Sequence, residues 1–218
     1  MDSSPPGPTS QDAASPRKRP WYLVLALLVG SLFGVLGFVG GWGTISLYRE
    51  KIEFQAAKDG LKDPAHQAAV EQAGQRWLQV LDEEKGRVFP LAAGELVLGL
   101  AAFFLAAGAM AGRDGARRAL VQVLIAQAAL VVTTHAMTPR VRAAQIELVR
   151  TARNAQLEEA DPVKAAEVRT TDELVMPLLP AFEWGIVAGR TFVAALVLLA
   201  LTRRRVREHF EAMSAGAE

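Results

Sequence analysis

Two ionisable residues stand inside long apolar stretches of the sequence, where a charge has a specific chemical consequence. Glu95 lies in the stretch 88–111, and Arg190 lies in AFEWGIVAGRTFVAALVLLALT, residues 181–202. The segment TFVAALVLLALT after Arg190 would be about 18 Å long as a helix, too short to cross a ~30 Å hydrocarbon layer alone. Arg190 should therefore lie within the hydrocarbon, where an arginine costs roughly 2.5–3.5 kcal/mol by insertion scales and needs a partner.

Depth along the helices predicts which polar residues can meet Arg190. A rise of about 1.5 Å per residue puts Arg190 about 13 Å and Glu95 about 10 Å below the outer surface. We therefore hypothesise an intramembrane ion pair between Glu95 and Arg190, in a polar cluster that also contains Gln127, His135 and Glu183. Three roles stay open for this cluster: a static pair that fixes helix order, a pathway for a proton, ion or small solute, and recruitment of a partner's transmembrane helix.

Other residues that commonly carry catalysis or bind metals are sparse in the sequence. There is no cysteine, and the three histidines, His66, His135 and His209, are far apart along the chain. We find no G-x-S-x-G, H-E-x-x-H, P-loop or Rossmann motif. The net charge of +1 gives no reason to expect nucleic-acid binding. The sequence therefore predicts a non-catalytic protein with no metal and no other cofactor.

Four apolar blocks are long enough to position these residues in a membrane. They cover residues 21–48, 88–111, 119–138 and 181–202. About 20 apolar residues cross the hydrocarbon as a helix, and a backbone in lipid must satisfy its own hydrogen bonds, so we expect four transmembrane helices. The first block follows the basic PRKRP, as a signal peptide would, but it is longer than an h-region and lacks an A-x-A site. We expect it to stay in the chain.

Arginine and lysine predict the orientation of the spans. Basic residues precede the first span, fill the short link 112–118 and begin the tail 203–218 as RRRVR, all on one side if there are four crossings. The positive-inside rule then puts both termini in the cytoplasm of a plasma (inner) membrane. RRRVR could also contact anionic lipid. Residues 1–20, rich in Pro, Ser and Gly, are expected to be a disordered cytoplasmic tail.

The two outer loops, residues 49–87 and 139–180, carry amphipathic helical patterns. Asp63 can cap a helix with Pro64 at its first position, and Gly86 can end that helix. Asp161 and Pro162 repeat the start signal, and Thr138–Pro139 indicates a kink after the third span. Apolar residues recur at helical spacing at Val70, Ala73, Trp77, Val80 or Leu81, and at Val141, Ala144 and Leu148. We expect the loops to pack into a small extracytoplasmic helical cap.

Small residues at helical spacing indicate which faces of the spans pack closely. The first span has Gly30, Gly34, Gly37 and Gly41, the second has Glu95, Gly99, Ala102, Ala106 and Ala109, and the third has Gln122, Ala126, Ala129 and Thr133. Whether the glycines face the same molecule or a second copy stays open.

The fold class we predict is all-α: an integral membrane four-helix bundle with a small helical cap formed by the two loops of about 40 residues. The function we expect is that of a non-catalytic accessory, scaffolding or envelope-binding component of the membrane. The alternative is a small transporter, or an ion- or proton-conducting protein, built on Glu95 and Arg190. The lipid bilayer is the expected partner, with a membrane protein or a second copy as possible further ones.

Overall fold

The computed structural model describes residues 20–48, 60–161 and 178–215, together with Val163, Val168, Thr170, Thr171 and Val175. Within this part of the chain all regular secondary structure is helical, in seven helices. The tail predicted to be disordered and the helix predicted after Pro162 lie almost entirely outside the described residues.

Four of the helices are long and apolar enough to cross a membrane, and the chain is therefore a multi-pass membrane protein. They are α1 (Trp21–Ser46), α4 (Lys85–Met110), α5 (Asp114–Met137) and α8 (Leu179–Thr202). Large apolar side chains cover their outward faces, among them Leu32, Phe104, Ile125, Phe192 and Leu199. A surface of this kind is unfavourable in water and matches a hydrocarbon surrounding.

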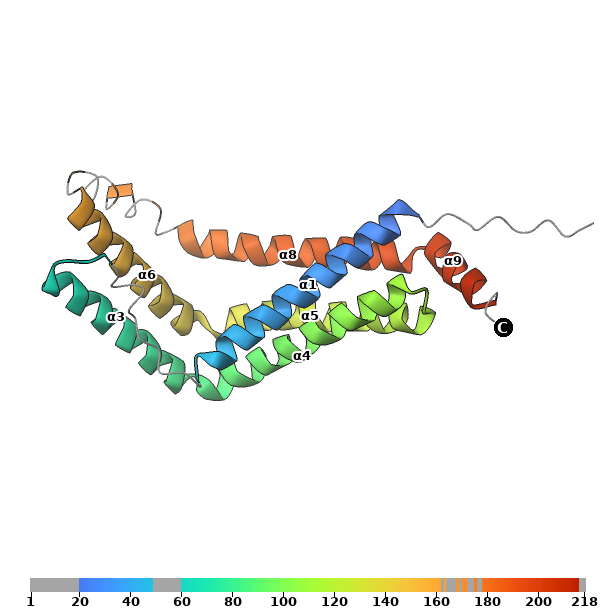
Figure 1. Ribbon diagram of the computed structural model, residues 1–218, viewed down its shortest axis with the longest axis horizontal. Helices are drawn as coiled ribbons and strands as arrows, with labels where there is room; N and C mark the ends of the chain where they lie inside the picture. Colours follow the sequence, from blue (N-terminus) through green and yellow to red (C-terminus); the bar gives the residue numbers. More distant parts are fainter. Residues whose placement is uncertain are drawn as a thin grey trace, which may run out of the picture.

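The four spans pack side by side with α4 and α8 at opposite corners. Helix α1 packs against both α4 and α8, and α5 packs against the same two helices. In Figure 1 the start of α1 and the short helix α9 (Arg204–Ala215) lie at one end of the spans. Helices α3 (Pro64–Glu83) and α6 (Pro139–Ala160) form a pair at the other end.

Glycines of α1 allow its backbone to touch that of α4. A Cβ added at Gly34 would lie 2.7 Å from the Phe103 nitrogen, and one at Gly41 would lie 2.5 Å from the Ala92 oxygen. A Cβ at Gly99 on α4 would lie 2.3 Å from the Phe38 nitrogen. All four predicted α1 glycines are buried, and Gly34, Gly37 and Gly41 face α4 of the same molecule. A Cβ at Gly30 would instead lie 3.9 Å from a Leu120 side-chain atom of α5.

The face of α5 that packs inside differs from the predicted one. Gln122, Ala126, Ala129 and Thr133 are all exposed, so the expected small-residue stripe of this helix faces outward. The buried face consists of Arg117, Leu120, Leu124 and Gln127. The reason is that α4 supplies the small residues of this interface: Leu130 of α5 lies against Gly94, and Ala116 lies against Gly108. Larger side chains of α5 can therefore face inward.

The half of the spans near α9 has a dry apolar core. Ala102, Ala106, Leu120 and Leu201 are fully buried there. The C-terminal segment, expected only as a tail, forms α9, and its Val206 and Phe210 join this core.

Arg117 fastens this end of the molecule. Arg117 lies one helical turn after Asp114, which is the first residue of α5. The sequence predicted residues 112–118 to be a link between two spans, but most of them belong to α5. The Arg117 guanidinium donates to Asp114 at 2.7 Å and to the Leu201 carbonyl oxygen at 2.9 Å, and it lies 5.5 Å from the centre of the Phe210 ring. An acid in the first helical turn is itself favourable. Arg117 is therefore a buried structural residue, not only a topology signal.

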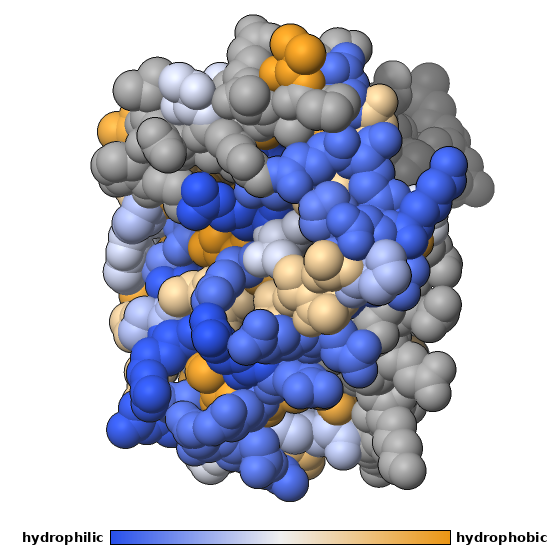
Figure 2. Space-filling model, turned by 90° about the vertical axis from the view of Figure 1, so that its left-hand side faces the viewer, coloured by the Kyte–Doolittle hydropathy of each residue, from blue (hydrophilic) through white to orange (hydrophobic). Residues whose placement is uncertain are grey.

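Helices α3 and α6 form an antiparallel pair with its own apolar contact. Asp63 caps α3 by accepting from the Ala65 N–H at 2.8 Å, with Pro64 at the first position. The buried contact consists of Leu61, Val70, Ala73, Trp77, Ala144, Leu148 and Ala155. The helix does not end at Gly86: the break falls at Glu84, and Gly86 lies inside α4. Figure 2 shows this end of the molecule, whose described surface is mostly hydrophilic.

Candidate functional site

A cavity of about 580 Å³ lies where the spans meet the α3–α6 pair. All four spans and both helices of the pair contribute to its wall. We call it the polar cavity, because Glu95, Thr134, His135, Arg142 and Arg190 line it together with apolar side chains. The cavity has Glu95 of α4 and Arg190 of α8 in its wall, and these two helices do not pack extensively on each other.

Glycines of α1 make room for the polar side chains beside the cavity. A Cβ at Gly40 would lie 3.7 Å from Oε2 of Glu95, so the carboxylate lies directly over this glycine. A Cβ at Gly37 would lie 2.5 Å from Nε2 of Gln127. The same amide donates to the Phe33 carbonyl oxygen at 2.9 Å. A larger residue at either glycine would displace the polar group that rests on it.

Arg190 lies between the polar cavity and a second, much smaller space. This second space has a volume of about 20 Å³, enough for about one water molecule, and Gln127 and Thr191 also line it. Oε1 of Gln127 is buried and has no hydrogen-bond partner among the described residues. Arg190 and Glu95 both line the polar cavity, and the ion pairs of the described chain do not include one between them. The predicted ion pair is thus not seen as a direct contact.

Arg142 joins three helices at the rim of the polar cavity. Pro139 has no N–H to donate to the His135 carbonyl oxygen, which would otherwise accept the next helical hydrogen bond. The Arg142 guanidinium donates to that oxygen instead, which ties α6 to the end of α5. It also pairs with the Glu183 carboxylate of α8 at 3.2 Å. Glu183, predicted as part of the cluster, is therefore satisfied by Arg142.

The His135 ring lies within this rim and keeps one free nitrogen. Its edge meets the Trp184 ring of α8, with ring centres 4.5 Å apart. Its Nε2 atom is buried and has no hydrogen-bond partner in the described part of the chain. A buried polar atom without a partner is unfavourable, and it remains able to bond a molecule that enters the cavity.

Apolar residues close the polar cavity toward the α9 end. Leu124 and Ala194, both buried, lie beyond Gln127 and Arg190. The apolar core around Leu120 and Leu201 lies further toward α9. The space is therefore polar near the α3–α6 pair and ends within the spans.

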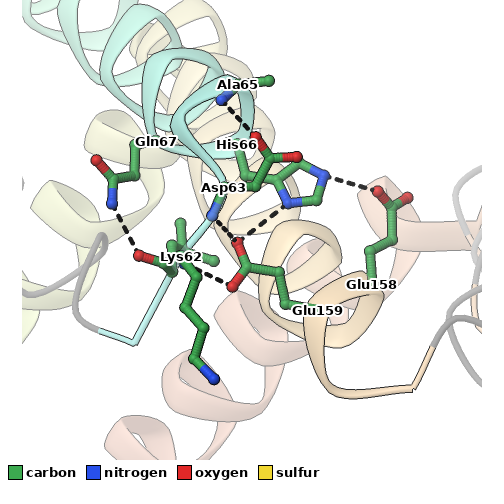
Figure 3. Close-up of polar contacts among 8 residues, drawn as sticks. Lys62, Asp63, Ala65, His66, Gln67, Glu158 and Glu159 are labelled. Atoms are coloured by element: carbon green, nitrogen blue, oxygen red, sulfur yellow. Dashed lines mark hydrogen bonds and ion pairs between the residues drawn. The ribbon is translucent and has the colours of Figure 1, made fainter.

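A second polar cluster lies at the tip of the α3–α6 pair (Figure 3). Nδ1 of His66 lies 3.2 Å from Glu159, and Nε2 lies 3.0 Å from Glu158. The backbone N–H groups of Asp63 and Lys62 donate to the Glu159 carboxylate at 2.9 and 2.6 Å. These two donors, followed by the His66 ring, hold the pKa of the Glu159 carboxyl below its usual range.

This tip cluster fastens α3 to α6 and offers no metal site. Both His66 ring nitrogens already meet carboxylates. Across the described residues, no group of three or more His, Asp or Glu side chains is arranged to hold a metal ion. His209 lies at the opposite end, against Phe210. The three histidines are therefore in three separate places.

The structure thus brings Glu95, Arg190 and His135 to one cavity and Gln127 to the small space beside it, which Arg190 also lines. Sequence reasoning missed Arg142 and Gly40. Arg142 could have been suspected because a proline frees the carbonyl four residues before it, and an arginine three residues after Pro139 can reach back to it. Gly40 carries no such signal, since its role depends on the angle at which α1 crosses α4.

Comparisons with family models, with curated proteins and with solved structures found no match to this chain.

Proposed function

We propose that the protein is a non-catalytic component of the plasma membrane, an accessory or scaffolding protein, and that its polar cavity binds another molecule of the cell envelope. The observation that carries this proposal is the cavity of about 580 Å³ between the spans and the α3–α6 pair. Ligand sites commonly have volumes of about 300–1,000 Å³ and combine an apolar wall with a few polar groups. The polar cavity has this composition.

Positive charge supports a cytoplasmic location for both termini. Arg113 and Arg118 at the α4–α5 turn and the arginines from Arg203 to Arg207 gather near α9, at one end of the spans. By the positive-inside rule this end faces the cytoplasm. The α3–α6 pair then forms an extracytoplasmic helical cap, and the polar cavity lies beneath it in the outer half of the membrane.

The proposal is tested by asking whether a molecule stays in the cavity. The chain purified in mild detergent is examined by native mass spectrometry for a bound molecule at one per chain. Gly40→Leu, which fills the cavity beside Glu95, should abolish that species. Gly189→Leu is the matched control, because nothing lies within 4 Å of a Cβ at this exposed position. A protein without any bound species, or equal occupancy in Gly40→Leu, would contradict cavity binding.

A small transporter or a proton- or ion-conducting protein is the second candidate. The water-sized space between Arg190 and Gln127 favours it, since it extends the polar cavity toward the inner half. The apolar core beyond that space favours binding over conduction. Solute or proton flux into liposomes that disappears in Glu95→Gln would support this second function.

A further inference from the structure

The polar cavity holds two opposite charges that do not neutralise each other by contact. Glu95 projects from α4 and Arg190 from α8, and these helices are at opposite corners. The other carboxylate of this region, Glu183, is bonded to Arg142. Among the described residues, Arg190 therefore has no carboxylate in an ion pair, and Glu95 has no cationic side chain in one.

An ionised side chain between apolar helices is unfavourable when no opposite charge is in contact with it. Moving an ion out of water costs several kcal/mol even after the protein relaxes. A ligand with a single charge would compensate one of the two residues and leave the other uncompensated. A ligand with both charges would compensate both at once.

The rest of the wall is suited to a molecule with polar and apolar parts. His135, whose Nε2 atom is free, lines the polar cavity, and Gln127, whose Oε1 atom is free, lines the small adjoining space together with Arg190. Thr134 adds a hydroxyl-bearing side chain to the wall of the polar cavity. The apolar wall consists of Val39, Leu47, Trp77, Leu81, Val131 and Val187.

We propose that the polar cavity binds a zwitterionic molecule, with its anionic group on the Arg190 guanidinium and its ammonium group on the Glu95 carboxylate. A guanidinium presents paired donors that match a phosphate or carboxylate, and an ammonium group donates to a carboxylate. This inference rests on the proposed function and names the ligand class of that site. The same chemistry occurs in the headgroup of an aminophospholipid and in a free amino acid.

Calorimetric titration of the delipidated full chain in detergent tests the ligand class and separates its two sources. The probes are short-chain phosphatidylethanolamine, the matched phosphatidylglycerol, which lacks the ammonium group, and free L-leucine. Phosphatidylethanolamine binding at least about tenfold tighter than phosphatidylglycerol is expected if a headgroup is the ligand. Binding of leucine without phosphatidylethanolamine would assign the site to a free zwitterion.

Two charge variants then assign each half of the ligand. Glu95→Gln should remove the preference for the ammonium-bearing probe, and Arg190→Gln should weaken every probe by about tenfold or more. Thr133→Val is the control, because Thr133 is exposed on the outer face of α5. Equal binding of both phospholipids in the wild type without leucine binding, an unchanged preference in Glu95→Gln, or no binding of any probe would overturn the inference. Phosphatidylglycerol binding that Gly40→Leu abolishes would keep cavity binding and reject the zwitterion.

A labelling experiment gives the same answer without altering either charge. The chain has no cysteine, so Thr44→Cys introduces a single thiol into the cavity wall. The bound zwitterion should slow modification of this thiol by a methanethiosulfonate reagent about tenfold, if about nine-tenths of the sites are occupied. An unchanged rate at saturating phosphatidylethanolamine and at saturating leucine would contradict the proposal.

Discussion

Arg117 and Arg190 are both arginines within apolar helices, and they differ in how far the protein satisfies them. The Arg117 guanidinium bonds Asp114 and the Leu201 carbonyl oxygen and lies against the Phe210 ring. Arg190 lines a cavity and, within the described chain, forms no ion pair with the carboxylate across it. Arg117, which stabilises the fold, is bonded by groups of the same chain. Arg190 instead faces a cavity, where its guanidinium can bind a ligand.

The two halves of the spans repeat this difference. Near α9 the helices meet through small and branched apolar residues that exclude water, such as Ala106 and Leu120. Near the α3–α6 pair the same helices diverge around the polar cavity. The close contact of α1 with α4 runs through both halves, because Gly34 and Gly41 both touch the α4 backbone. This contact therefore fixes the position of the half that contains the cavity relative to the half with the apolar core.

The largest effect is expected where the two backbones touch. In Gly41→Ala the new methyl group would lie 2.5 Å from the Ala92 oxygen and 2.6 Å from the Leu96 nitrogen, and neither backbone atom can move aside alone. We expect a loss of about 3 kcal/mol in the free energy of unfolding. Gly43→Ala, two residues later with nothing within 4 Å, should instead gain up to about 1 kcal/mol from helix propensity. Denaturation in detergent, followed by circular dichroism, compares the two. Equal stabilities would mean that α1 does not contact α4 in this way.

Removing Arg117 should have the next largest effect. Arg117→Met leaves Asp114 and the Leu201 carbonyl oxygen without their buried donor, so we expect a loss of about 2 kcal/mol and release of α9. Arg118→Met is the matched change, because Arg118 also pairs with Asp114, at 2.6 Å, but is 70% exposed. An exposed pair contributes at most about 1 kcal/mol. Unfolding and the rate of proteolysis within α9 measure the difference. If the two variants behave alike, Arg117 is not the fastening residue.

Removing the charges of the polar cavity should have the opposite sign. In the ligand-free protein, Glu95→Leu and Arg190→Leu each remove a charge that lacks a contact partner, so each should raise the free energy of unfolding, by about 1 kcal/mol. The double variant should equal the sum of the two within about 0.5 kcal/mol. A coupling energy well above that value would instead support the direct ion pair predicted from the sequence. Unfolding of the four proteins in the same detergent completes this cycle.

The smallest effect is expected at the tip of the α3–α6 pair. The Glu159 carboxyl has a pKa that is lowered in the folded protein. Its contribution to stability is therefore present above the unfolded pKa of about 4.3, and it is lost as the pH falls through the folded value. Glu159→Gln should reduce the stability at neutral pH and flatten the decline in acid. Glu147→Gln, in an exposed ion pair with Arg76, serves as control. A decline of wild-type steepness in Glu159→Gln would show that another group titrates.

The four membrane helices could be predicted from the sequence because hydrocarbon imposes a length and an apolar composition on each span. Depth could also be predicted, since a constant rise per residue brings Glu95 and Arg190 to similar levels. The rotation of each helix about its own axis could not be predicted. Thr133 and Ala129 were expected inside and face outward, because Gly94 and Gly108 of α4 already provide the close approach.

Contacts that depend on the direction of a chain after a kink were also beyond the sequence. The partner of Glu183 is Arg142, which reaches it only because α6 turns away from α5 at Pro139. In the same way, the segment that forms α9 was expected to be a tail, because it begins with the basic residues RRRVR that follow the last span. Its Val206 and Phe210 are buried only because the folded spans place an apolar core, which includes Leu201, beside them.

The most direct test of a hollow half near the α3–α6 pair and a packed apolar half near α9 is cysteine labelling along a single helix. Thr134→Cys lines the polar cavity and Leu120→Cys is fully buried in the apolar core, and both lie on α5 of a chain without native cysteine. We predict that an impermeant methanethiosulfonate reagent, added outside intact cells, modifies the thiol at 134 and leaves that at 120 unmodified until the protein is denatured. Equal reaction at both positions, or reaction at 120 alone, would contradict the division of the molecule into these two halves.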